Sequence, residues 1–149
     1  MKRLVLIAAL GTALLQQPGW AAEKARAAKA DCYTENAIEA EQAIRFLTDV
    51  MVISSTCQDT VYAEFRLRNQ EPIRAYQKTM ITHFHGNKAF DTWNTSLANQ
   101  YSQKRAGLPT AQICEQAAEL MKTAKGLDPQ TFRQYAVAQV QTANAACAK

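Results

Sequence analysis

Apolar residues that recur at intervals of three and four positions dominate this chain and restrict what it can fold into. Six such series begin at Ile44, Val61, Ile73, Phe90, Ile113 and Phe132. This spacing places the apolar side chains on one face of an α-helix. No stretch of useful length alternates with the period of two that a half-buried strand requires. We therefore predict an all-α protein, a bundle of five or six helices stapled by two disulfides.

Capping and breaking residues set the expected ends of these helices. Thr34 or Asp31 can cap the first helix, and Pro72 suits the first turn of a later one. Gly126 and Pro129 stop one helix and start the next. The helices are expected over residues 34–56, 59–69, 72–86, 90–106, 113–124 and 129–146.

The first 21 residues have the pattern of a cleavable export signal. Lys2 and Arg3 precede an apolar run over residues 4–15, and a small-x-small pattern follows at residues 19–21, with Gly19 and Ala21 as the small residues. The run is shorter than the roughly 20 residues that a membrane-spanning helix needs. No cysteine follows it directly, as a bacterial lipoprotein would require. We expect a signal peptide over 1–21, a flexible spacer over 22–31 and a single helical domain over 32–149, periplasmic or secreted.

Export would place the four cysteines in an oxidising compartment, where Cys32, Cys57, Cys114 and Cys147 are expected to form two disulfides. Two geometric arguments disagree about their pairing. A continuous first helix separates Cys32 from Cys57 by about 35 Å, far beyond the roughly 7 Å that a disulfide allows. A helical hairpin near residues 126–128 brings Cys114 close to Cys147, which would leave Cys32 for Cys57. The strong apolar stripe of the first helix favours Cys57–Cys114 with Cys32–Cys147.

The charge of the chain is unevenly distributed. Without Lys2 and Arg3 of the signal, the 17 basic and 13 acidic residues leave a net charge of 15 − 13 = +2, which is too weak to indicate nucleic-acid binding. Residues 34–57 carry four acidic side chains and one basic, whereas residues 64–105 carry seven basic and three acidic. Oppositely charged helices packed side by side are the simpler interpretation, and a basic face for an acidic partner is the functional one. The candidate contact residues are Arg66, Arg68, Arg74, Lys104 and Arg105.

Two patterns invite a catalytic or metal-binding interpretation. His83 and His85 could ligate a metal with Asp91, but side chains two positions apart on a helix diverge by about 200°. A helix C-terminus that favours imidazolium is the simpler explanation of these histidines. Glu35 and Glu39 share a helix face and could hydrolyse cell-wall glycosides, although such carboxyls usually flank a cleft from separate elements.

Other catalytic signatures are absent from the sequence. The chain has no Cys-x-x-Cys, no Gly-x-Ser-x-Gly and no glycine-rich phosphate loop. No cofactor is therefore expected, and the protein is more consistent with a non-enzyme than with an enzyme. Any small-molecule pocket is expected between residues 91–102 and the helix face that carries Tyr76 and Met80.

The chain resembles poorly characterised small secreted four-cysteine helical proteins of Gram-negative bacteria. The resemblance lies in Cys32, the run over residues 39–57, the run over residues 95–99 and Cys114. It implies export and an α-helical fold. It implies no activity and no site residue, because none of these residues is a functional signature.

Together these features favour an exported, non-enzymatic helical module that binds another exported or envelope protein, as an inhibitor, an immunity protein or a chaperone-like binder. A periplasmic small-ligand or metal carrier is the first alternative. A cell-wall hydrolase that uses a helical carboxylate is the second. No nucleic-acid partner and no membrane span after signal cleavage are expected.

Overall fold

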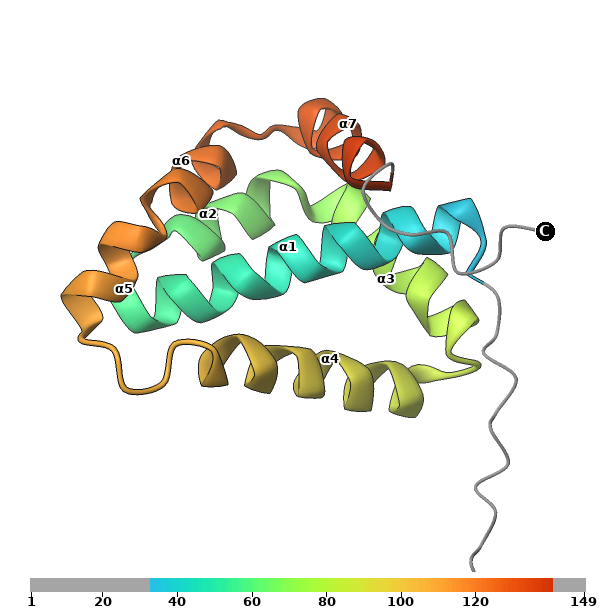
Figure 1. Cartoon of the computed structure of the whole chain (residues 1–149). Coiled ribbons are helices and arrows are strands. Elements are labelled where there is room, and N and C mark those ends of the chain that lie inside the picture. Colours follow the sequence, from blue (N-terminus) through green and yellow to red (C-terminus); the bar gives the residue numbers. More distant parts are fainter. Residues whose placement is uncertain (1–32, 141–149) are drawn as a thin grey trace, which may run out of the picture. The chain divides into compact units, whose positions relative to one another are not determined.

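The computed structural model describes residues 33–140, which form seven α-helices and no strand (Figure 1). They are α1 (Glu35–Cys57), α2 (Val61–Arg68), α3 (Gln70–His83), α4 (Asn87–Gln103), α5 (Thr110–Gln116), α6 (Ala118–Gly126) and α7 (Pro129–Val140). The predicted all-α fold is confirmed for this part of the chain. The expected signal peptide and spacer, Cys32 and Cys147 lie outside it. Among the residues described, no helix is both long enough and apolar enough to cross a membrane.

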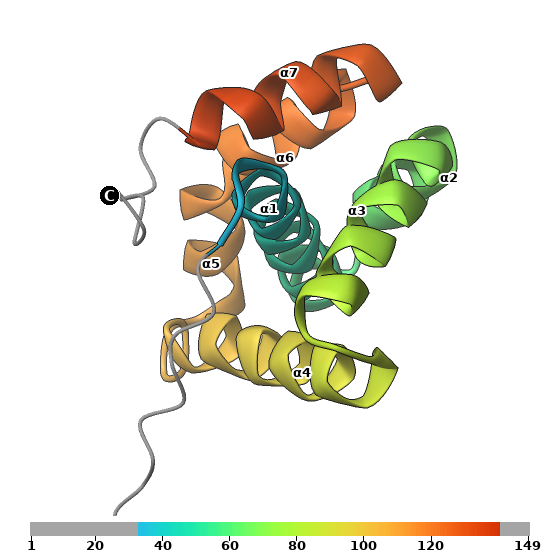
Figure 2. The same cartoon turned by 90° about the vertical axis from the view of Figure 1, so that its right-hand side faces the viewer.

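Helix α1 is the central element, and each of the other six helices contacts it. Viewed close to its axis, α1 is surrounded by α3, α4, α5 and α7 (Figure 2). Eleven of its 23 residues are buried, and they cover more than half of the circumference of the helix rather than one stripe. Ala40, Ala43, Val50 and Ile53 are completely buried. A helix with so wide an apolar face belongs in a core, and α1 occupies that position, with its remaining polar face carrying Glu41, Arg45 and Asp49.

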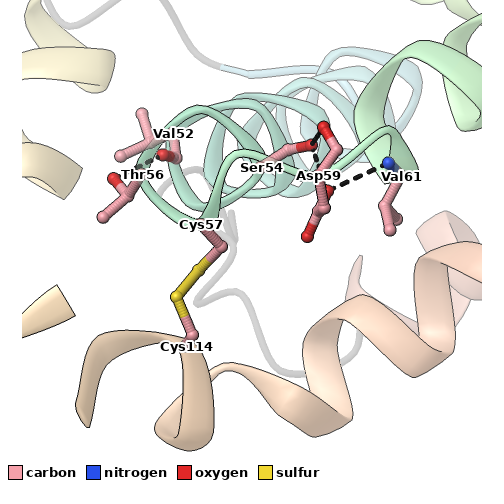
Figure 3. Close-up of a disulfide and its surroundings, with 7 residues drawn as sticks. All are labelled: Val52, Ser54, Thr56, Cys57, Asp59, Val61 and Cys114. Atoms are coloured by element: carbon pink, nitrogen blue, oxygen red, sulfur yellow. Dashed lines mark hydrogen bonds between the residues drawn. A yellow bond between two sulfur atoms is a disulfide. The ribbon is translucent and has the colours of Figure 1, made fainter. Parts of the chain in front are cut away.

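Polar side chains define both ends of α1. The Thr34 hydroxyl accepts a hydrogen bond from the Ala37 N–H at 3.2 Å, which confirms Thr34 as the cap. At the other end Gln58 adopts a left-handed conformation, and its N–H bonds the Ser54 carbonyl. The Asp59 carboxylate then accepts the Val61 N–H at 3.0 Å and the Ser54 hydroxyl (Figure 3). These bonds turn the chain directly from α1 into α2.

A disulfide joins Cys57 at the end of α1 to Cys114 in α5, with their Cα atoms 5.8 Å apart (Figure 3). The predicted Cys57–Cys114 pair is confirmed. The bond fastens the C-terminal end of the central helix to a helix 57 positions later in the chain. The second predicted pair, Cys32–Cys147, falls outside the described residues.

The single helix expected over residues 113–124 is two helices in the structure. The described part of the chain therefore has seven helices, more than the predicted five or six. Helix α5 ends at Gln116, and α6 begins at Ala118 after a change of direction at Ala117. Helix α5 packs mainly on α1, where the disulfide holds it, whereas α6 packs mainly on α2. The chain bends because its two halves have different packing partners. Ala117 itself is buried at the bend.

An aromatic cluster joins the last helix to the first three. The Phe132 ring of α7 is fully buried and meets Phe65 of α2 edge-on, with 5.0 Å between ring centroids. It also lies 5.7 Å from Tyr76 of α3 and 6.1 Å from Phe46 of α1. Edge-to-face contacts of this kind add to the free energy gained by burying the rings. Phe132 is therefore the main contact through which α7 stabilises the fold.

Candidate functional site

The five basic residues predicted as contact residues lie in two separate places. Arg66 and Arg68 are on α2 and Arg74 is on α3, whereas Lys104 and Arg105 directly follow the end of α4. Helices α2 and α4 lie on different sides of α1 (Figures 1 and 2). The five residues therefore do not form one patch. The contacts of each guanidinium decide which of them are available to a partner.

Arg68 is bonded to the chain's own backbone. Its guanidinium donates to the carbonyls of Ala124 at 3.0 Å, Lys125 at 3.1 Å and Leu127 at 2.9 Å. The buried amide of Asn69 donates to the same Leu127 carbonyl at 3.1 Å. The last carbonyls of a helix have no partner within it, and Arg68 bonds those of α6. This arginine holds α6 against α2.

Replacing Arg68 by alanine is expected to lower the free energy of unfolding by about 1–2 kcal/mol, because three carbonyls lose a charged donor at a partly exposed site. The same substitution at Arg66 is the matched control and should change it by about 0.5 kcal/mol or less. Urea denaturation of both variants measures the difference. Equal losses in the two variants would contradict a structural role specific to Arg68.

Arg105 also has a partner within the fold. Its guanidinium lies 2.8 Å from a carboxylate oxygen of Asp49 on α1, as an ion pair without a well-aligned hydrogen bond. It also donates to the Tyr101 carbonyl at 3.0 Å. The Lys104 ammonium lies 5.3 Å from the centre of the Tyr101 ring. These contacts fasten the end of α4 to the middle of α1.

The pKa of Asp49 is raised by burial, an effect that the attraction of Arg105 and Lys104 only partly offsets. The Asp49 carboxyl therefore stays protonated to a higher pH in the folded state than in the unfolded chain. As pH rises through the titration of this group, the free energy of unfolding falls. Asp49→Asn removes this contribution. As pH rises through and above the ordinary titration range of an aspartate, the stability of the variant relative to wild type should therefore increase. Urea unfolding at several pH values measures this difference, and a constant or falling difference would contradict the assignment.

Arg66 and Arg74 are arranged differently, because both line one narrow hollow between α1, α2 and α3. The hollow has a volume of about 120 Å³. Its other lining residues are Leu47, Tyr62, Gln70, Ile73 and Gln77. Within residues 33–140, neither guanidinium has a hydrogen-bond or ion-pair partner. Two arginines thus share one opening with no carboxylate of the fold between them.

A second, wider hollow of about 350 Å³ continues this surface along α2. It shares Tyr62, Arg66 and Gln70 with the first hollow and adds Ala63 and Leu67. The Leu67 side chain is 78% exposed, the most exposed large apolar side chain among the described residues. We call this surface the α2–α3 face, and it comprises Tyr62, Ala63, Arg66, Leu67, Gln70, Arg74 and Gln77.

The residues predicted as metal ligands lie at three different hollows. The His83 ring contacts Tyr33, with 4.0 Å between ring centroids, and lines a hollow between α1 and α3. His85 follows α3 in a left-handed conformation and lines a hollow beside Trp93. Asp91 lines a further hollow on α4. In the described part of the chain, no three His, Cys, Asp or Glu residues are grouped so that they could hold a metal ion.

The two candidate catalytic carboxylates have different surroundings. Glu39 accepts a hydrogen bond from the Tyr76 hydroxyl at 2.7 Å. Burial, followed by this bond, raises the pKa of Tyr76. Glu35 is exposed in the first turn of α1, where the helix dipole favours a negative charge. Glu39 therefore helps to join α1 to α3.

The small-molecule pocket was expected between α4 and the face of α3 that carries Tyr76 and Met80. Both of those side chains are buried in the core. A hollow of about 610 Å³ does lie beside α4, but it is lined by His85 from the turn before that helix and by Trp93 and Ser96 of the helix itself. It is therefore a surface feature rather than a space inside the helical core.

Comparison of the chain with protein-family models, with curated proteins and with solved structures finds no significant match.

Proposed function

We propose that this protein is an exported, non-enzymatic module that binds an acidic surface of another exported or envelope protein through the α2–α3 face. The observation that carries the proposal is the combination of two guanidiniums without partners among residues 33–140 and a leucine that is 78% exposed. Exposed apolar side chains beside arginine are typical of protein interfaces. Arginine is also enriched among the residues that dominate binding energy.

The acidic side chains near this surface have partners of their own. Glu71 of α3 forms an ion pair with Arg133 of α7. Glu64 of α2 accepts a hydrogen bond from the Thr60 hydroxyl at 2.6 Å. Arg66 and Arg74 are therefore not neutralised by these carboxylates, and they favour a partner of opposite charge.

Two observations support export as the setting for this activity. The N-terminal 21 residues have the charge and apolar pattern of a secretory signal. The Cys57–Cys114 disulfide is of a kind that persists in oxidising compartments. The partner is accordingly sought among exported and envelope proteins.

Site-specific photo-cross-linking in the producing cells tests this proposal. A benzophenone amino acid placed at Leu67 should give one dominant cross-linked product, because that side chain lies at the proposed contact. The same probe at Val137, which is 50% exposed on α7, is the matched control and should not give this product. No discrete product from position 67, or the same product from both positions, would contradict a binding role for the α2–α3 face.

A further inference from the structure

We propose that the narrow hollow between Arg66 and Arg74 binds a carboxylate group carried on a short apolar stem. This inference rests on the proposed function and adds the chemical group that the α2–α3 face recognises. A glutamate side chain of the partner, a chain-terminal carboxylate and a free small acid share this chemistry. Two guanidiniums that have no partner within the described part of the chain, the size of the hollow and its lining all favour it.

The charge of the hollow selects an anion. Arg66 and Arg74 are like charges at one opening, so their mutual repulsion opposes bringing them together in the absence of an anion. An arginine fork matches the two oxygens of a carboxylate and can bond both at once. The amides of Gln70 and Gln77, which line the same hollow, can donate further hydrogen bonds.

The size of the hollow and the two apolar side chains in its largely polar lining favour a short stem. The hollow, of about 120 Å³, offers several times the space that one water molecule needs. A carboxylate with one or two methylene groups fits this space. The side chains of Leu47 and Ile73, both buried, line the hollow and can cover the methylene groups. A bare inorganic anion would leave these apolar contacts unused.

Chemical-shift titration of the oxidised mature protein tests the inference. The probe is N-acetyl-glutamate methylamide, and its neutral control is N-acetyl-glutamine methylamide. The acid should bind saturably with a Kd of roughly millimolar order, as expected for a ligand of this size. It should shift the amides of Tyr62, Arg66, Gln70 and Arg74 most. The amide control should bind at least about tenfold more weakly, because it lacks the charge.

Variants identify the groups responsible. Arg66→Gln with Arg74→Gln should weaken binding of the acid at least about tenfold, whereas Lys88→Gln on α4 should leave it unchanged. Arg66→Lys with Arg74→Lys keeps both charges but loses the fork, so it should give an intermediate Kd. Because Arg66 and Arg74 are exposed, these variants should remain folded, which an unchanged spectrum outside the α2–α3 face verifies.

Three further probes distinguish the sources of the carboxylate. N-acetyl-alanine represents a chain terminus, acetate a free acid and inorganic phosphate a bare anion. Equal binding of the acid and its amide, tightest binding of phosphate, or indifference to the Arg66 and Arg74 variants would overturn the inference. If the acid binds but the cross-link at position 67 is absent, the hollow takes a free acid and the proposed function fails. If the cross-link forms but the acid does not bind, the partner binds the face without inserting a carboxylate.

Discussion

Replacing Cys57 and Cys114 together by serine is expected to lower the free energy of unfolding by about 4 kcal/mol. The disulfide closes a loop between positions 57 residues apart, and such a loop restricts the unfolded chain far more than the folded one. Both cysteines are half-buried, so the serine side chains should add little strain or cavity volume. Changing both residues also avoids leaving one free thiol that could exchange with the remaining cysteines.

Urea denaturation of the oxidised proteins measures this loss. Wild type and the Cys57→Ser, Cys114→Ser variant should have the same circular dichroism spectrum without urea and clearly different midpoints. Ser55→Ala, an exposed change near the end of α1, is the control and should shift the midpoint little. A loss below about 1 kcal/mol would show that this disulfide does not restrict the unfolded chain as its position implies.

Replacing Phe132 by alanine is expected to cost about 3–5 kcal/mol. The ring is completely buried and contacts aromatic rings of α1, α2 and α3, so its removal leaves a cavity where four helices meet. The loss should come mainly from detachment of α7, because Phe132 and Ala136 are the two buried residues of that helix. Phe132→Leu should cost less, since it keeps part of the apolar volume.

Hydrogen exchange and urea denaturation together check this prediction. Phe132→Ala should increase exchange most strongly in the amides of α7, in addition to lowering the unfolding midpoint. Val137→Ala on the same helix is the control, because Val137 is 50% exposed and should change stability by about 0.5 kcal/mol or less. Similar losses in the two variants would contradict the central role of the aromatic cluster.

The helical class and most helix positions followed from apolar spacing, but the central place of α1 did not. The stripe through Ile44 and Leu47 predicts one buried face. The helix also carries Ile38, Phe46 and Ile53 away from that stripe, and these too are buried. Their presence on other faces was the available signal that α1 would be surrounded. A single-stripe interpretation therefore underestimated how many neighbours this helix has.

The bend between α5 and α6 could not be read from local residues. Positions 113–124 contain neither glycine nor proline, and their apolar spacing continues across Ala117. The bend arises because the disulfide holds α5 on α1 while α6 packs on α2. Such competition between tertiary contacts overrides local helix propensity.

The candidate site shows the same division between local pattern and tertiary contact. An excess of basic residues over positions 64–105 indicated a basic surface, and both Arg66 and Arg68 were candidate contact residues on it. These two residues are only two positions apart on α2, yet Arg68 bonds carbonyls 56–59 positions later, whereas Arg66 lines the hollow. The position of α6 is what distinguishes the roles of Arg66 and Arg68. The charge pattern of the sequence does not predict where α6 packs.

The central claim is that the α2–α3 face binds a protein partner, and quantitative capture of exported and envelope proteins by the oxidised mature protein tests it most directly. Three proteins are compared: wild type, a double variant with both Arg66→Glu and Arg74→Glu, and the control Lys88→Glu. The account predicts one stoichiometric partner that wild type and Lys88→Glu retain equally. The double variant should retain at least about tenfold less of this partner than wild type does, although its unfolding midpoint is the same as that of Lys88→Glu. Equal capture by all three proteins would contradict a role for the α2–α3 face in binding.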